Sequence, residues 1–139
     1  MEVLRRVSVA PVAVPHRAIV DVSIMGYFIP KDTSMLINLR SLHMDKDYWG
    51  DPEAFRPERF IDAAGQLKKD PENFLPFGTG RRRCMAESLA RATLFMFISS
   101  LLLNFKFTPC PEAELPDCIE GRDGVTLTPL PYRGFVTPR

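Results

Sequence analysis

Proline is the residue that most constrains how this chain can fold. Its 13 prolines lie within residues 11–76 and 109–138. Each proline removes a backbone donor and disfavours helix at the residue before it, so neither region is suited to a long helix. The interval between them predicts one long helix, at residues 85–104, whose side chains are almost all apolar. Because a helix that is apolar all round is typically buried all round, we expect this one to be covered.

Short elements are predicted on both sides of the long helix. The pattern indicates a helix end at 1–8, an extended segment at 9–15, strands at 18–24, 27–30 and 34–39, helical turns at 42–49, a meander at 51–60, a strand at 105–108, and a terminal hairpin of 125–128 with 133–137. The first three strands are expected to form one small antiparallel sheet. Since these elements are small, we expect a partner, more chain or a large apolar ligand to cover the long helix.

Composition limits the classes of function. A formal net charge of +1 gives no general signal for binding polyanions, so nucleic acid is not expected as a partner. The three cysteines, Cys84, Cys110 and Cys118, form no C-x-x-C pair, which argues against a zinc site and a disulfide framework. The apolar run at 92–103 is too short to span a membrane. We therefore expect the chain on its own to be soluble and cytoplasmic.

The most informative stretch is residues 73–91, NFLPFGTGRRRCMAESLAR. Gly78 and Gly80 allow a tight loop, and three arginines at 81–83 lead to Cys84. A cysteine close to a helix N-terminus and to guanidinium groups is favoured as the thiolate. The guanidinium groups also suit carboxylate or phosphate.

Four interpretations of this stretch compete on residues alone. The first is a buried, inert cysteine beside a solvated arginine run. A thiol phosphatase would need an arginine six residues after the cysteine, where Ala90 stands instead. A phosphate-binding loop would need Gly-Lys-Ser or Gly-Lys-Thr, which the sequence lacks. The fourth is a thiolate ligand to haem iron, with arginine on a propionate and the apolar helix against the porphyrin.

The motifs resemble those of one family, the haem-thiolate monooxygenases known as cytochromes P-450. Its haem-binding pattern, F-x-x-G-x-R-x-C-x-[GA], is matched by Phe77, Gly80, Arg82, Cys84 and Ala86. The family's E-x-x-R is matched by Glu2 and Arg5, and its PERF segment supplies Arg59; residues 15–17, 26–31 and 42–45 also resemble family segments. Only Ala86 departs from the commonest residue, which is glycine. The amino-acid sequence of the loop and helix is similar to that of the microsomal, drug- and steroid-hydroxylating class.

The resemblance implies a fold and a place for the parent protein. The expected fold class is α+β, as the C-terminal part of the mainly α cytochrome P-450 fold, with residues 1–139 forming a single partial domain, about a third of such a protein. Met1 falls inside the E-x-x-R helix, so we expect the chain to be truncated, without the membrane anchor and the central helix. The full-length parent is expected in the endoplasmic reticulum membrane.

The resemblance also implies roles for particular residues. Cys84 would be the axial thiolate ligand of the iron of haem b, Arg82 would bind a propionate, and either His16 or Arg17 would meet a propionate from the strand side. Phe77 would shield the sulfur. The remaining cofactor-binding residues would be Gly78, Gly80, Met85, Ala86 and Ala90.

Two further groups follow from the same comparison. Glu2, Arg5 and Arg59 would form a buried charge network that holds the meander and the thiolate loop without taking part in catalysis. Residues at the family's substrate pocket are Val12, Ala13, Val14, Val125, Thr126 and Leu127, for which a plain strand core is the alternative.

The function implied is insertion of one oxygen atom from O2 into an apolar organic substrate such as a steroid, fatty acid or xenobiotic. Electrons would come from an NADPH-dependent flavoprotein reductase. The 139 residues alone are not expected to turn over. The alternative is a catalytically dead fragment or splice product with at most weak binding of haem or a partner.

Overall fold

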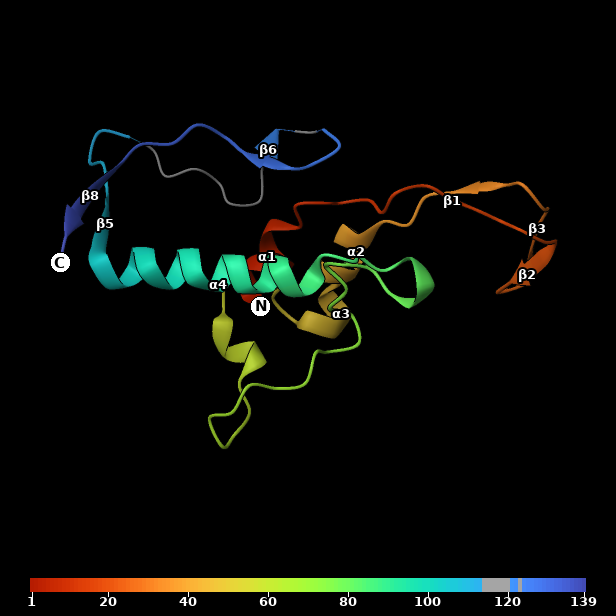
Figure 1. The fold of residues 1–139 in the computed structure, drawn as a ribbon, viewed down its shortest axis with the longest axis horizontal. Coiled ribbons are helices and arrows are strands. Elements are labelled where there is room, and N and C mark those ends of the chain that lie inside the picture. The colour runs from red at the N-terminus through yellow and green to blue at the C-terminus, as the bar shows by residue number, and fades with distance from the viewer. Residues whose placement is uncertain (114–120, 123) are drawn as a thin grey trace. The chain divides into compact units, whose positions relative to one another are not determined.

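The computed structural model describes residues 1–113, 121–122 and 124–139, so Cys118 lies outside the described residues. The chain, whose helices and strands are drawn as a ribbon in Figure 1, has contacts that divide it into two compact units. The first contains residues 1–76 and 124–127, and the second contains residues 77–123 and 128–139.

The helices of the first unit are short, and side chains cap α2 and α3. They are α1 (Glu2–Val7), α2 (Leu39–His43), α3 (Lys46–Trp49) and the 3-10 turn η1 (Pro57–Phe60). The Asn38 side chain accepts from the Ser41 N–H ahead of α2, and Asp45 accepts from the Asp47 and Tyr48 N–H groups ahead of α3. These caps satisfy amides that a helix start leaves unpaired. The one or two helical turns predicted at 42–49 are two short helices, and the first begins earlier than predicted, at Leu39.

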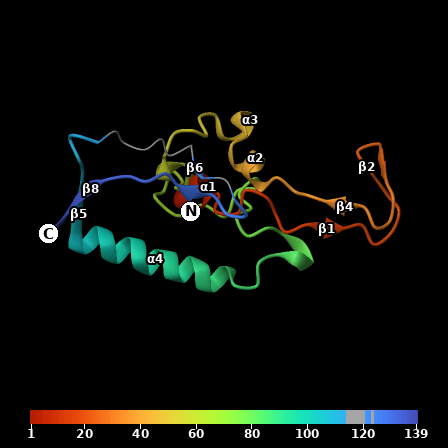
Figure 2. The same cartoon turned by 90° about the horizontal axis from the view of Figure 1, so that it is seen from above.

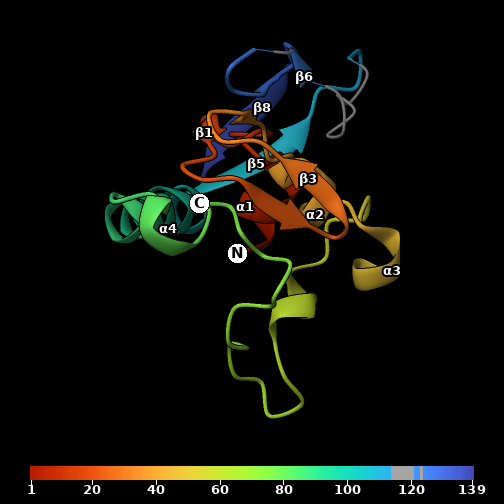
Figure 3. The ribbon, with the colours of Figure 1, turned by 90° about the vertical axis from the view of Figure 1, so that its right-hand side faces the viewer.

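The strands of the first unit form two separate antiparallel pairs, so the prediction of one sheet is wrong. Strand β1 (His16–Arg17) pairs with β4 (Ser34–Met35), and β2 (Val22–Ile24) pairs with β3 (Tyr27–Ile29), as Figure 3 shows for the second pair. The predicted strand at 18–24 breaks because the chain bends after Ala18, which exchanges hydrogen bonds with Thr33 and Asp32. The predicted strand at 34–39 ends early because Asn38 caps α2.

The β2–β3 hairpin closes through the two-residue turn Met25–Gly26, where the sequence predicts a turn of residues 25–27; Tyr27 is already part of β3. Both residues have positive φ, 50° and 85°. This backbone is the primed turn whose twist matches that of paired strands, and glycine adopts it at little cost.

The core of the first unit is aromatic. Trp49, Phe60 and Phe74 are buried, with ring centroids 5.8 Å apart for Trp49–Phe60 and 5.1 Å apart for Phe60–Phe74. Met1 and Leu4 pack against this cluster from α1. Tilted and edge-on aromatic pairs of this kind stabilise a core beyond their buried area. The meander at 51–60, irregular in backbone, is thus held by Phe60 at its end.

The second unit contains the cysteine loop, the long helix and two strand pairs. The loop holds the 3-10 turn η2 (Gly80–Arg82), and α4 spans Glu87–Asn104, beginning two residues later than predicted. Strand β5 (Phe105–Pro109) leaves the end of α4 and pairs with β8 (Gly134–Pro138), as Figure 2 shows. Strand β6 (Gly121–Arg122) pairs with β7 (Thr128–Pro129). The predicted terminal hairpin is wrong, because residues 134–138 pair with β5 and Thr128 pairs with Arg122 of β6.

The prediction that α4 is buried is also wrong for this chain. Its apolar side chains include Leu89 at 70% exposure, Phe95 at 70% and Leu103 at 74%. No residue of α4 is buried by the residues that the structure describes. The predicted cover, which is a partner, more chain or a large apolar ligand, therefore stays a prediction. In the part of the chain that the structure describes, no helix is long and apolar enough to cross a membrane.

Candidate functional site

The loop before α4 presents a cysteine on a closed turn. Gly78 and Gly80 have φ values of 70° and 69°, a region that side chains with a Cβ disfavour. The turn closes through the Cys84 N–H, which donates to the Phe77 carbonyl at 2.8 Å, and through the Arg83 N–H, which donates to the Gly80 carbonyl at 3.3 Å. Cys84 is exposed and free, so its sulfur is accessible to a ligand. Of the residues predicted for this site, Phe77 and Cys84 are therefore brought together.

Positive charge surrounds this cysteine without compensation. Arg81, Arg82 and Arg83 are all exposed, and none of them makes an ion pair with any residue that the structure describes. Cys84 lies two residues before Ala86, the N-cap of α4, and this cap makes no side-chain hydrogen bond to the helix. An anionic ligand is favoured by such surroundings.

Arg91 of α4 contacts the Phe77 ring, a feature that sequence reasoning missed. Arg91 donates from Nε to the Glu87 carboxylate at 2.9 Å, and its guanidinium lies over the Phe77 ring, 5.4 Å from the centroid. The i,i+4 spacing of Glu87 and Arg91 is a signal that the sequence carries. Met85 and Ala86 are exposed and Ala90 is half-buried, so these three predicted residues line no closed surface of this unit.

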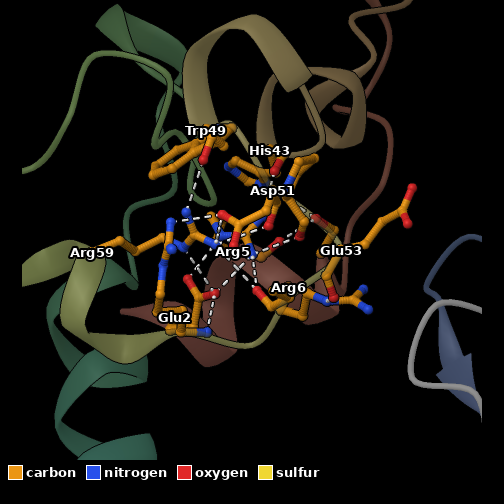
Figure 4. Close-up of polar contacts among 12 residues, drawn as sticks. Glu2, Arg5, Arg6, His43, Trp49, Asp51, Glu53 and Arg59 are labelled. Atoms are coloured by element: carbon orange, nitrogen blue, oxygen red, sulfur yellow. Dashed lines mark hydrogen bonds and ion pairs between the residues drawn. The ribbon is translucent and has the colours of Figure 1, made fainter.

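The first unit contains the charge network that joins the predicted Glu2, Arg5 and Arg59 (Figure 4). Arg5 donates from Nε and Nη2 to the two Glu2 oxygens, both at 2.8 Å, and is fully buried. Arg59 donates from Nε to Glu2 at 3.2 Å. Burial acts to raise the pKa of Glu2, but the hydrogen bonds from Arg5 and the Arg56 N–H, with the Arg5 and Arg59 charges, outweigh it, so this pKa is lowered.

The two arginines also bind backbone carbonyls from distant parts of the chain. Arg5 donates to His43 O at 2.6 Å and to Pro52 O at 2.8 Å. Arg59 donates to Trp49 O at 3.0 Å and to the Asp51 carboxylate at 3.0 Å. Sequence reasoning missed Asp51, whose carboxylate lies next to Pro52 in the meander and binds Arg59. The network thus ties α1 to the segment from α2 to η1.

The other predicted residues of the first unit lie on strands and extended segments. His16 and Arg17 form β1, and Arg17 pairs with Asp32 at 3.0 Å on an exposed surface. Val12 forms a bridge with Asn38, and Ala13 donates its N–H to Ile37 O at 2.9 Å, while Val14 is exposed. The residues at 124–127 join the same unit, where the Leu127 N–H donates to Val9 O at 2.9 Å; Val125 and Thr126 are exposed. The two predicted pocket segments therefore belong to the same unit, and Leu127 is bonded to Val9, three residues before Val12.

Comparison with known proteins identifies the family. The family model described as cytochrome P-450 matches residues 1–134, nearly the whole chain. The chain belongs to the cytochrome P-450 family. The α+β pattern of short sheets and helices is that of part of a cytochrome P-450.

Curated relatives and solved structures agree. The chain is 47% identical over 133 residues to "Probable cytochrome P-450 305a1" of Drosophila melanogaster, covering 96% of this chain and 26% of that protein. It is 44% identical over 139 residues to cytochrome P-450 2U1 of Homo sapiens, covering 100% and 25%. A solved zebra fish cytochrome P-450 structure with abiraterone has a TM-score of 0.87 and 46% identity, covering 99% of this chain and 32% of that one. These relatives confirm the microsomal-like class, and the chain spans about a quarter of the curated relatives' length.

Cytochromes P-450 use haem b with an axial cysteine thiolate, and the residues present fit that group. The Cys84 sulfur is accessible, and Arg82 is exposed without an acidic partner among the described residues. A Cβ built on Gly80 meets no atom within 4 Å, so the loop surface there is open. The chemistry of these donors, a thiolate and a guanidinium, suits iron and a propionate.

Proposed function

We propose that this chain supplies the thiolate side of a haem-thiolate monooxygenase. The observation that carries the proposal is the accessible Cys84 on a turn closed by the Phe77 carbonyl, within a chain that matches the cytochrome P-450 family along its length. When bound, haem b with an axial thiolate supplies the chemistry of O–O cleavage, because the thiolate donates electron density to the iron.

Each residue of the motif has a proposed role toward haem. Cys84 would hold the iron, and Arg82 would donate to a propionate oxygen. Phe77, with the Arg91 guanidinium over its ring, would shield the sulfur from water. Gly78 and Gly80 give the loop its turn. Met85, Ala86 and Ala90 would contact the ring, and His16 or Arg17 would meet a propionate; Arg17 already pairs with Asp32, which favours His16.

The reaction proposed is insertion of one oxygen atom from O2 into an apolar organic substrate, such as a steroid, fatty acid or xenobiotic. The segments at 12–14 and 125–127 would contact it, which the Leu127–Val9 hydrogen bond supports by placing them in one unit. Relatives include steroid 17-alpha-hydroxylase/17,20 lyase of Oryzias latipes, 42% identical over 139 residues. Electrons would come from an NADPH-dependent flavoprotein reductase, and the whole protein would reside in the endoplasmic reticulum membrane.

We further propose that residues 1–139 belong to one cytochrome P-450 domain and do not turn over alone. The exposed apolar side chains of α4 and the quarter-length match support this proposal. Adding the reductase, NADPH and a steroid to the haem-loaded chain should give no product, whereas product formation would contradict it.

Haem reconstitution tests the site. The purified chain is loaded with haem, reduced and exposed to carbon monoxide, and its absorption spectrum is compared with those of Cys84→Ser and Cys110→Ser. We expect a red-shifted, thiolate-type Soret band in the wild type and in Cys110→Ser, and its loss in Cys84→Ser. A band that survives in Cys84→Ser, or that is lost equally in both variants, would refute Cys84 as the ligand. No band in any of the three would favour a fragment that binds haem weakly or not at all.

A further inference from the structure

We propose that His43 is a positioning residue, which holds the backbone at Leu75 and so sets the start of the Cys84 loop. The inference deepens the proposed function and rests on it for the link to haem. It concerns three contacts within the first unit: His43 to Ser8, His43 to Leu75, and Arg5 to His43.

The hydrogen bonds around the imidazole allow one neutral tautomer. The Ser8 hydroxyl donates to the Arg5 carbonyl at 2.8 Å, so its oxygen accepts from His43 Nδ1, 3.0 Å away. The Leu75 N–H donates to His43 Nε2 at 3.2 Å, so Nε2 carries no proton. His43 thus links the end of α1 to a backbone amide 32 residues later in the chain.

The surroundings keep the imidazole neutral. His43 is 1% exposed, and its ring lies 6.0 Å from that of Phe74. The charged group facing it comes from α1, where the Arg5 guanidinium donates to the His43 carbonyl and is neutralised by Glu2. Burial, and secondly the Arg5 charge, lower the pKa of His43 to about 4. In an imidazolium Nε2 carries a proton, so it could no longer accept the hydrogen bond from the Leu75 N–H.

The hydrogen bond from Leu75 to His43 lies directly after Phe74, where the chain leaves the aromatic core. Phe74 is buried in the aromatic core, and Leu75 is bonded to His43. Pro76 has no N–H, so the Leu75 amide is the last donor before Phe77, whose carbonyl closes the turn at Cys84. Loss of the His43 acceptor should therefore loosen the backbone from Leu75 to Cys84.

Two substitutions separate this role from general stability. In His43→Gln, the longer side chain places an amide oxygen near the position of Nε2 and keeps an acceptor for Leu75. In His43→Asn, the shorter side chain reaches only the Nδ1 position and keeps the Ser8 contact. Both remove the imidazole from the same buried site, so each is the matched control of the other.

The readouts are amide hydrogen exchange at Leu75 and Cys84, haem dissociation from the loaded chain into an excess of an apo haem-binding acceptor, and global unfolding by urea. We expect His43→Asn to exchange about tenfold faster at both amides than His43→Gln, the factor that corresponds to one buried hydrogen bond. Haem should leave His43→Asn faster by a similar factor. Equal exchange in the two variants, or exchange that only follows their global stability, would overturn the proposal.

The wild-type chain provides a test that needs no variant. Nitrogen-15 NMR of the imidazole distinguishes the two neutral tautomers, and we expect Nδ1 protonated and Nε2 bare at pH 7. A proton on Nε2 would overturn the proposal even if His43→Asn fails to fold. If the wild type shows no thiolate-type band, the proposed function fails, whereas the tautomer and the exchange at Leu75 still decide the role of His43.

Discussion

Replacing Glu2 by glutamine should destabilise the first unit severely. Glu2 accepts four hydrogen bonds, from Arg5 Nε and Nη2 at 2.8 Å each, from the Arg56 N–H at 3.0 Å and from Arg59 Nε at 3.2 Å. Glutamine keeps the shape but removes the charge, and its NH2 group cannot accept. Arg5, which is fully buried, then has no anion to balance it.

The magnitude follows from weighing two effects. At about 1.5–3 kcal/mol for each charge-assisted bond, four bonds would total about 6–12 kcal/mol. Arg5 and Arg59 keep their backbone carbonyl partners, however, so part of this stabilisation remains. We therefore expect a loss of about 3–5 kcal/mol in the free energy of unfolding, the range found when one partner of a buried pair is removed.

Urea unfolding followed by Trp49 fluorescence measures this loss, because Trp49 lies in the core and its carbonyl binds Arg59. The matched control is Glu53→Gln. Glu53 pairs with Lys46 at 3.5 Å, and both side chains are more than half exposed, at 56% and 74%. An exposed pair is worth about 0–1 kcal/mol, so the control should change little. If Glu2→Gln loses no more stability than Glu53→Gln, the argument that the network holds the unit together is refuted.

Three other predictions address the pH response, the loop and the arginines. The pKa of His43 is lowered from 6.5 to about 4, so the contribution of its neutral form to the free energy of unfolding should be complete above pH 6.5 and should fall as the pH drops towards 4, by about 2–3 kcal/mol. Urea titrations of the wild type and of His43→Gln should differ in this pH window. Gly80→Ala should destabilise the loop by about 1–2 kcal/mol, since its φ is 69° and no steric contact adds to that cost; faster amide exchange at Cys84 checks this, and unchanged exchange contradicts it. Arg82→Gln should weaken haem affinity about tenfold and Arg83→Gln about twofold or less, measured by haem titration, and equal effects would refute a specific propionate contact.

The sequence predicted those parts of the fold that depend on local chemistry. Glycines, prolines and capping residues act over a few positions, so a turn at residues 25–27 was predicted; the structure closes it with Met25 and Gly26 and places Tyr27 in β3. The long helix was predicted to within two residues at its start. The strand at 18–24 was wrong because its break follows from hydrogen bonds to Thr33 and Asp32, which apolar alternation does not encode.

Long-range partners were beyond the sequence for a physical reason. The backbone carbonyls that Arg5 binds lie at His43 and Pro52, and every residue offers a carbonyl, so no residue type marks them. The Leu75 amide that His43 accepts is equally unmarked. The prediction that α4 is buried was wrong because an apolar sequence indicates that a helix requires a cover, but it does not indicate whether the same chain provides one. Motifs predicted Glu2, Arg5 and Arg59 together only because their order resembled a family.

Burial divides the motif residues into two groups whose effects should be separable. Glu2, Arg5 and Arg59 have their partners within the first unit, so they govern the stability of the chain without ligand. Arg82 and Cys84 are exposed, and surface substitutions away from buried contacts change stability by only about 0.5 kcal/mol. A ligand that binds only the folded state stabilises it in proportion to the logarithm of its concentration over its dissociation constant. The stability that haem adds should therefore disappear in Cys84→Ser, while the stability of this variant without haem stays at its wild-type value. In Glu2→Gln we expect the reverse: the stability without haem falls, while haem still adds stability.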